Sequence, residues 1–380
     1  MNVATHFLSL LLAVTSQAVW ALDHIVMEQD GKAVQLTGRV LTEAQNGGLL
    51  VQDREGVLFA VQPGQLVSRT RDDTPFSFWA AEELQTRLLE QLPAGFRVHT
   101  TVHYLICYNT SPVYAKWCGS LYERLFQAFY NYWERRGLKL TEPEHPLVAL
   151  IFADRASYEG YACAELGEAA TSVVGFYSLR TNRVSMFDLT GSKGLQGPVR
   201  RFTSTAQINS LLMQPDAERL VATIIHEATH QIAFNCGLHT RYADVPQWVS
   251  EGLAVFFETP DLRSSQGWRD IGGVSPSRLA QFRRYLTTRP AESLQSLVQD
   301  DKRFRQAGTA LDAYAEAWAL QHYLITTRLS DYVRYLQKLS EKPVMIYDTP
   351  EERLAEFRQA FGDDLSALDA DFLRYASALR

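Results

Sequence analysis

The chain has 380 residues, of which 46% are apolar and 21% are charged, an ordinary composition for a soluble globular protein. This length allows about two or three domains. The formal net charge of -6 argues against a nucleic-acid-binding protein, because such proteins are usually basic with clustered Lys and Arg.

Residues 1–21 predict a secretory signal peptide. An apolar run extends from Phe7 to Trp20, and Val19 and Ala21 supply small residues at the cleavage site. The run is too short to span a bilayer comfortably. A short membrane anchor or a buried N-terminal helix is the alternative, because only His6, and no Lys or Arg, precedes the run. We expect an exported protein (periplasmic, cell-envelope or extracellular) with no stable membrane span in the mature chain.

Residues 22–95 are interpreted as a small accessory module. Short apolar runs between 24 and about 70 are separated by turns rich in Asn, Asp and Gly, which predicts antiparallel β structure. The segment 73–95 predicts a helix that links this module to the rest of the chain. Its role is not evident from the sequence.

From about Arg97 the pattern changes to alternating strands and helices. We expect a strand at 98–108, an aromatic-rich core helix at 115–136, a buried strand at 147–152 and a hairpin formed by 173–177 and 183–187. A helix begins near Asp216 as N-cap and runs to Cys236, where Gly237 stops it. Beyond residue 245 almost every pattern is helical. The expected fold class is α+β, with a mixed sheet and one central helix in residues 96–345, then a helical part, and C-terminal helices at 346–380.

The central helix carries the sequence His226-Glu227-Ala228-Thr229-His230 within an apolar run. Positions i and i+4 share one face of a helix, so the imidazoles of His226 and His230 can bind one Zn²⁺ ion without distortion of the backbone. Glu227 projects beside the metal, where it can act as the general base toward the water that zinc activates. The motif alone is suggestive, since it also occurs by chance.

A second motif follows as Trp248-Val249-Ser250-Glu251-Gly252-Leu253-Ala254. Pro246 and the apolar spacing indicate a helix. Catalytic zinc needs three protein ligands and one open position, and His226, His230 and Glu251 would supply them. The alternative is that Glu251 is a surface carboxylate on an amphipathic helix, although a buried and unpaired Glu would be costly there.

Together these motifs resemble those of the gluzincin, or peptidase MA-like, superfamily of zinc metallopeptidases, which pair HExxH with a Glu in a later helix. The chain looks most like a secreted bacterial branch known only as a domain of unknown function, and the resemblance covers residues 97 to 340. It implies a thermolysin-like catalytic fold. It also implies an edge strand that binds an extended peptide, which would be Gly175, Phe176 and Tyr177 in this chain.

The chain departs from the family at one position. Relatives often have an acid four residues after the ligand Glu that supports a ligand His, and this chain has Val255 there. Glu258, or a backbone carbonyl, would have to take that role. The oxyanion needs a donor besides zinc. The resemblance favours Tyr314 at the start of a later helix, with packing in the core as the alternative role.

The other histidines are weaker candidates. His239 is a second possible oxyanion donor but is expected to lie in a surface loop. We reject His103, His145 and His322 as metal ligands, because none has a partner at ligand spacing.

Four cysteines remain, and an even number in an exported chain permits two disulfides. The short loop favours Cys107–Cys118, which leaves Cys163–Cys236. Four buried free thiols are an equally good interpretation. No pair has CxxC spacing, which argues against a cysteine zinc site.

The sequence therefore predicts a peptidase with one zinc ion that acts on peptide or protein outside the cytoplasm. Two alternatives stay open. The first is an inactive relative that uses the same fold to bind protein or cell-envelope material. The second is an unrelated helical protein with a chance motif. The substrate, endo- or exopeptidase action and the oligomeric state cannot be derived from these patterns.

Overall fold

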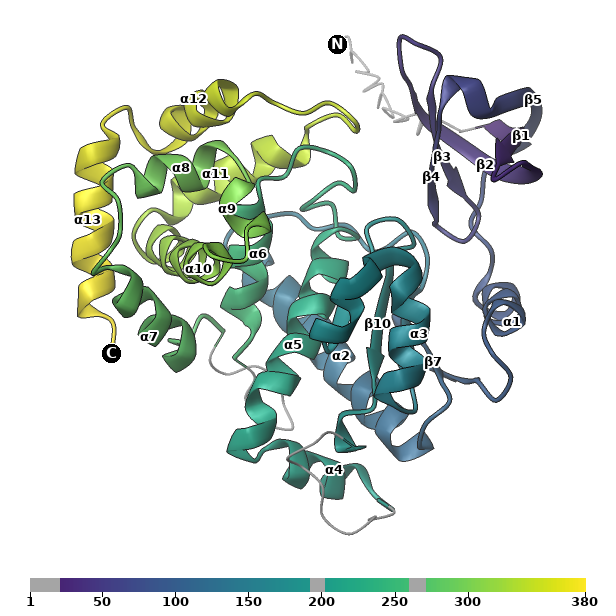
Figure 1. Ribbon diagram of the computed structural model, residues 1–380, viewed down its shortest axis with the longest axis horizontal. Coiled ribbons are helices and arrows are strands. Elements are labelled where there is room, and N and C mark those ends of the chain that lie inside the picture. The colour runs from purple at the N-terminus through teal and green to yellow at the C-terminus, as the bar shows by residue number, and fades with distance from the viewer. Residues whose placement is uncertain (1–20, 192–201, 260–270) are drawn as a thin grey trace, which may run out of the picture. The chain divides into compact units, whose positions relative to one another are not determined.

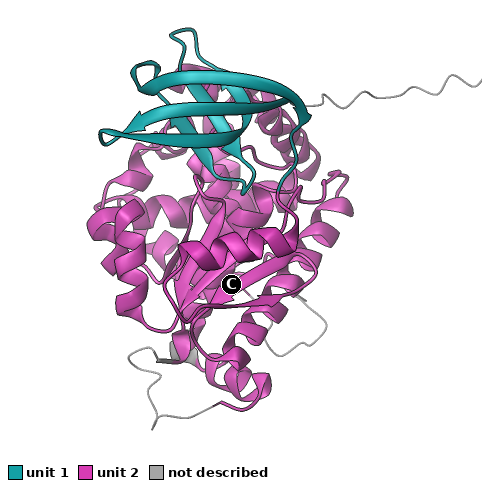
Figure 2. Cartoon of the chain, turned by 90° about the vertical axis from the view of Figure 1, so that its right-hand side faces the viewer, with its two compact units in different colours: residues 1–78 teal, residues 79–380 magenta. Residues whose placement is uncertain are grey.

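The computed structural model describes residues 21–191, 202–259 and 271–380. The predicted signal peptide lies outside these ranges except for Ala21. The chain divides into two compact units, residues 1–78 and 79–380, which Figure 2 shows in different colours. The division falls earlier than the expected residue 95. Leu84 and Leu88 of helix α1 (Ala81–Gln91) are buried in the core of the second unit, so this helix belongs to that unit.

The first unit is the expected antiparallel β module. Its strands are β1 (Ala21–Gln29), β2 (Lys32–Glu43), β3 (Leu49–Asp53), β4 (Leu58–Val61) and β5 (Leu66–Pro75). The sheet order is β4-β3-β2-β1-β5, so the last strand returns to pair with the first. Alternate residues point to one face and form a small core that includes Ile25, Met27, Val40 and Val51. The tight turn between β1 and β2 uses Asp30 and Gly31, both with positive φ.

The second unit contains a mixed five-stranded sheet of order β6-β7-β8-β10-β9. Its strands are β6 (Arg97–Thr100), β7 (Tyr104–Tyr108), β8 (Leu147–Phe152), β9 (Gly175–Tyr177) and β10 (Arg183–Phe187). The three central strands β7, β8 and β10 are parallel and fully buried, which explains their continuous apolar sequences. The predicted single strand at 98–108 is in fact two antiparallel strands, because the N–H of Thr101 bonds to the carbonyl of Tyr104 and the chain turns there.

The predicted hairpin at 173–187 is confirmed, and its outer strand β9 forms one edge of the sheet. In the turn, Asn182 takes a left-handed conformation with φ of 60°. Asn tolerates this conformation better than most residues, because its short polar side chain can form local hydrogen bonds. The amide of Asn182 exchanges hydrogen bonds of 2.8 Å with that of Asn235, which follows helix α5 (Pro215–Ala233). The hairpin is therefore fixed to α5.

Helices cover both faces of the sheet. Figure 1 shows α2 (Pro112–Glu134) and α5 on one side of the strands and α3 (Arg155–Leu166) on the other. Ser111 caps the start of α2, and Pro112 occupies its first turn. Helix α5 begins at Pro215 with Gln214 as N-cap, rather than with the expected Asp216, and ends before Gly237.

The described residues after 245 are mainly helical, as expected. The short helix α4 (Thr205–Leu212) precedes α5, and α6 (Gln247–Phe257) follows it. The later helices are α7 (Pro276–Tyr285), α8 (Ser293–Gln299), α9 (Lys302–Arg305), α10 (Ala310–Thr327), α11 (Leu329–Ser340), α12 (Pro350–Phe361) and α13 (Leu365–Ala378). Residues 346–380 belong to the second unit and pack on its core through Phe357 and Phe372. The fold is thus α+β. None of the helices described here has both the length and the apolar character needed to cross a membrane.

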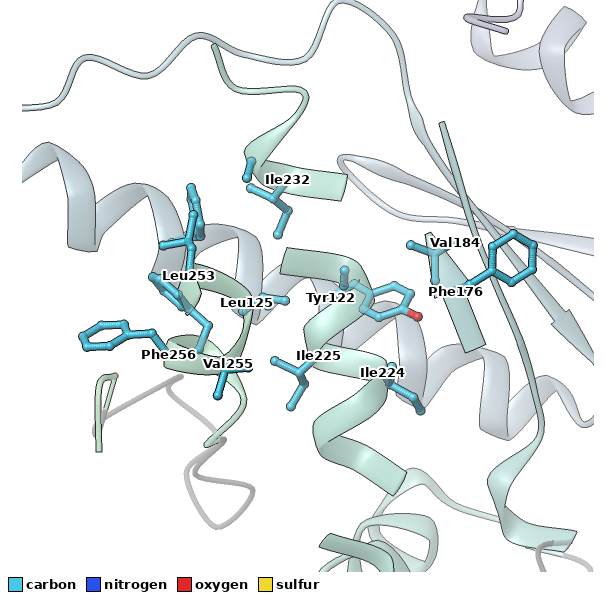
Figure 3. Close-up of a cluster of buried hydrophobic side chains, with 14 of the residues drawn as sticks. Tyr122, Leu125, Phe176, Val184, Ile224, Ile225, Ile232, Leu253, Val255 and Phe256 are labelled. Carbon is cyan, nitrogen blue, oxygen red and sulfur yellow. The ribbon is translucent and has the colours of Figure 1, made fainter. Parts of the chain in front are cut away.

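One apolar core surrounds α5. Figure 3 shows that its side chains come from four sources: Tyr122 and Leu125 of α2, Phe176 and Val184 of the hairpin, Ile224, Ile225 and Ile232 of α5, and Leu253, Val255 and Phe256 of α6. The apolar side chains of α5 thus pack between the sheet and α6, while its polar Gln231 donates to the backbone carbonyls of Val148 and Asn182. Gly252 lets α6 approach α10 closely, since a Cβ atom there would lie 3.0 Å from the carbonyl oxygen of Ala317.

All four cysteines are free thiols, so neither expected disulfide is present. Tyr104 of β7 contacts Tyr122 of α2, and alternation along β7 turns Cys107 to the other face of the sheet, away from Cys118 of α2. Cys163 is exposed on α3, whereas Cys236 is fully buried after α5, on the opposite face.

Candidate metal centre

Three side chains from α5 and α6 converge on one point. The Nε2 atoms of His226 and His230 are 3.1 Å apart, and Oε2 of Glu251 lies 3.1 Å from the first and 3.5 Å from the second. Ligands held about 2.1 Å from a tetrahedral ion are separated by about 3.4 Å. The donor set and its spacing therefore fit zinc. Within the described residues this is the one group of at least three His, Cys, Asp or Glu side chains that could hold a metal ion.

The ring of His226 is oriented by a second carboxylate. Its Nδ1 lies 2.8 Å from Oε1 of Glu258, the C-cap residue of α6. A carboxylate accepts, so Nδ1 carries a proton, and Nε2 is the nitrogen left to bind a metal ion once it is deprotonated. Burial alone lowers the pKa of His226, but the hydrogen bonds to Glu251 and Glu258 outweigh it and raise that pKa well above its usual range. A metal ion must therefore displace a proton here.

Glu227 lies beside the ligands and is held by the sheet. Its Oε2 accepts a hydrogen bond of 2.7 Å from the backbone N–H of Tyr177 on the edge strand β9. Burial raises the pKa of Glu227, and the nearby His226 and His230 reduce that rise without cancelling it. The carboxylate is thus more basic than an ordinary Glu, which suits a general base.

A pocket of about 600 Å³ opens onto these groups. The carboxylates of Glu227 and Glu251 and both ligand histidines line it, and Tyr314 of α10 lines it as well. The charge of Glu251, then burial, raises the pKa of Tyr314 well above its usual range, so its hydroxyl keeps its proton and remains a donor.

The predicted substrate strand is brought to the same place, but only one of its side chains reaches the pocket. Tyr177 lines it, whereas the ring of Phe176 is 8% exposed and packs in the core near Tyr158. Gly175 lies in close contact with β10, where a Cβ atom would be 2.9 Å from the carbonyl oxygen of Ser185.

The other histidines lie outside the centre. His239 was expected to lie in a surface loop, and this expectation is wrong. It is 2% exposed and packs against Phe234. Burial, together with the nearby His230, lowers its pKa to about 3. His103 pairs with Glu123 and His145 bonds to the carbonyl of Pro146. His322 bonds to Tyr375 and to the carbonyl of Gly272, so none of these belongs to the ligand group.

A buried ion-pair network at the far end of the pocket was not predicted. Arg353 of α12 donates to both carboxylate oxygens of Asp244 and to Oδ1 of Asp301, and all three residues line the pocket. Oδ1 of Asp301 also accepts from the backbone N–H of Gln247, the first residue of α6. The network therefore fixes the start of the helix that carries Glu251. Its members are 52 to 109 residues apart in sequence, so no local pattern indicates them.

A family model described as "Protein of unknown function (DUF1570)" matches residues 220–345, and no curated protein matches the chain. The matched segment contains His226, Glu227, His230, Glu251 and Tyr314, and it ends before Arg353. The similarity is thus concentrated on the helices that build the candidate centre.

Proposed function

We propose that this protein is an exported zinc metallopeptidase of the gluzincin type, with a thermolysin-like catalytic part, that hydrolyses peptide bonds in protein or peptide outside the cytoplasm. One observation carries the proposal. Two imidazole nitrogens and a carboxylate oxygen lie within 4.8 Å of one another, on two packed helices, beside a half-buried Glu that an edge strand holds in place.

The ligands would be His226, His230 and Glu251. Zinc, when bound, supplies a Lewis acid that polarises a carbonyl group and makes water nucleophilic near neutral pH. Glu227 takes a proton from the attacking water, whose oxygen forms a bond to the scissile carbonyl carbon. As the C–N bond breaks, Glu227 gives that proton to the leaving amine. Its raised pKa supports both transfers.

The edge strand β9 supports an extended peptide as substrate. Along a strand, alternate backbone groups point to the same side. The N–H of Tyr177 points away from β10 toward Glu227, so the backbone groups of Gly175 face outward on the same side. A substrate chain would add there by β-augmentation, which gives affinity through the main chain with little sequence preference.

Tyr314 would donate its hydroxyl proton in a hydrogen bond to the oxyanion. The raised pKa of this hydroxyl and its place in the pocket support the role. Removal of one such donor lowers kcat by a factor of about 10² to 10³ in other acyl-transfer enzymes.

Metal analysis combined with peptide cleavage tests the proposal. The wild-type protein is expected to hold one zinc ion and to cut members of a peptide library, whereas Glu227→Gln should keep the zinc and lose cleavage by a factor of about 10² to 10⁴. Glu218→Gln, on the same helix, is the matched control. Zinc binding without cleavage by the wild-type protein would favour the inactive binding protein, and absence of zinc binding would overturn the proposed peptidase.

A further inference from the structure

Arg278 on α7 contacts the carboxylate that orients the first ligand. One of its terminal nitrogens lies 3.0 Å from Oε1 and 3.4 Å from Oε2 of Glu258. The side chain of Glu258 is only 10% exposed and that of Arg278 is 24% exposed, so solvent does little to weaken the pair. The same Oε1 accepts from His226. A chain of contacts therefore extends from Arg278 to the metal position.

The same guanidinium lies against a second residue of the site. Its central carbon is 5.8 Å from the centre of the Tyr314 ring, within the range of a cation–π contact. Phe304 packs edge-on against that ring at 5.3 Å. Arg278 and Phe304 together restrict where the Tyr314 hydroxyl can lie.

We propose that Arg278 is a positioning residue that aligns the His226 ligand, through Glu258, with the oxyanion donor Tyr314. The inference rests on the proposed function. The inference extends the proposed function, because it names a residue that touches neither metal nor substrate and yet affects both metal affinity and turnover.

A purely structural role is the alternative, in which Arg278 only neutralises a buried carboxylate. The two roles differ in what a lysine can replace. A lysine supplies the charge that Glu258 needs, but its single ammonium group cannot contact the carboxylate and the tyrosine ring at the same time, as the extended planar guanidinium can. Arg278→Lys should therefore keep the stability of the wild-type protein but lose the alignment of His226 with Tyr314.

The experiment compares Arg278→Met, Arg278→Lys and Arg284→Met, the last being an exposed position on the same helix. Three quantities are measured: the unfolding midpoint of the zinc-free protein, the zinc dissociation constant by competition with a chromophoric chelator, and kcat and KM on one cleaved peptide. We expect Arg278→Met and Arg278→Lys each to weaken zinc binding by a factor of about 10 and to lower kcat with little change in KM. Arg278→Lys should keep the wild-type unfolding midpoint, and Arg284→Met should match the wild type throughout.

A second comparison separates the two arms of the proposal. In a Tyr314→Phe background the ring contact remains but the hydroxyl is absent, so Arg278→Lys should still weaken zinc binding while its effect on kcat becomes smaller. Wild-type zinc affinity and kcat in Arg278→Lys would overturn the inference and leave the proposed function intact. Absence of zinc binding in the wild type would instead overturn both the proposed function and this inference. Absence of cleavage alone would count against the proposed function, and the zinc dissociation constants would still test the link to Glu258.

Discussion

Glu258 and His226 are joined by a hydrogen bond of 2.8 Å from Nδ1 of the imidazole, although Glu258 lies seven residues after Glu251. Positions 251, 255 and 258 share one face of α6, since they are separated by one helical turn each. Val255 occupies the middle position and is 1% exposed in the core. Glu258, about one turn beyond Val255, is therefore the residue of this helix face that reaches Nδ1 of His226.

We predict that Glu258→Ala weakens zinc binding by a factor of about 10 to 100, because His226 loses the partner that fixes its ring and its tautomer. Glu258→Gln should lose less, since the amide oxygen can still accept from Nδ1. The zinc dissociation constant measures both. Glu341→Ala, an exposed position, is the control. Unchanged affinity in Glu258→Ala would show that the hydrogen bond does not support the ligand.

The four thiols provide a test of the fold. Cys107, Cys118 and Cys236 are buried, and burial raises the pKa of Cys107 and of Cys236 to about 12, so their thiolates are scarce at neutral pH. We predict that a thiol reagent modifies one cysteine, Cys163, in the native protein and all four after denaturation. Cys163→Ser should abolish the native reaction. Only two reactive thiols, or none, after denaturation without reductant would mean that disulfides form.

Several elements were predictable because their cause is local. The spacing of His226 and His230, and the apolar runs of β8, determine a helix face and a buried strand whatever lies around them. The turn at Thr101 was missed, since apolar residues continue on both sides of it. The unit boundary was also misplaced, because only the tertiary packing of Leu84 and Leu88 assigns α1 to the second unit.

Some residues of the candidate metal centre were likewise predictable from the sequence, and others were not. Motif spacing predicts the side chains proposed as ligands and base, and the resemblance to a known family predicts Tyr314. Arg278, Asp301 and Arg353 contact the site across loops and helices that are distant in sequence, and nothing in their neighbourhood distinguishes them from ordinary surface charges. Residues that support a site from other helices can be identified only from the tertiary structure.

The ion pair between Arg353 and Asp244 gives a prediction about stability. Both side chains are at most 9% exposed. Without Arg353, the buried carboxylate of Asp244 keeps only Lys342, at 3.5 Å, as a positively charged partner among the described residues, so Arg353→Met should reduce the free energy of unfolding by about 3 kcal/mol at pH 7. Chemical denaturation of the zinc-free protein measures this. Arg374→Met, at a position with a 75% exposed side chain, should be near neutral.

The pH dependence identifies the cause of that loss. Burial alone raises the pKa of Asp244, but the hydrogen bonds and charge of Arg353 outweigh it and lower that pKa below 3.8. A carboxyl group with a lowered pKa in the folded state stabilises the fold above its unfolded pKa, and this stabilisation is lost as the pH falls. The difference between wild type and Arg353→Met should therefore shrink below about pH 4. A difference that stays constant from pH 7 to pH 3 would assign the loss to packing alone.

The rim of the pocket has an unusual backbone. Tyr242 and Met345 both have φ of 62°, which is costly for residues with bulky side chains, and the N–H of Met345 bonds to the carbonyl of Tyr242 at 2.7 Å. A bridge between Ala243 and Val344 strengthens this contact. Two residues after Met345, Tyr347 is part of the pocket lining although it is 57% exposed. Strain that is kept at such a place suggests a functional role.

We predict that Tyr347 contacts a substrate side chain and favours apolar residues near the scissile bond. Tyr347→Ser should lower kcat/KM by a factor of about 10 for a peptide with Leu or Phe at that position. A matched peptide with Ser there should be cut equally by both proteins, because it has no apolar group to lose contact with the ring. Ile346→Ser is the control, since Ile346 is 59% exposed and does not line the pocket. An equal loss on both peptides would show that Tyr347 shapes the rim without selecting the substrate.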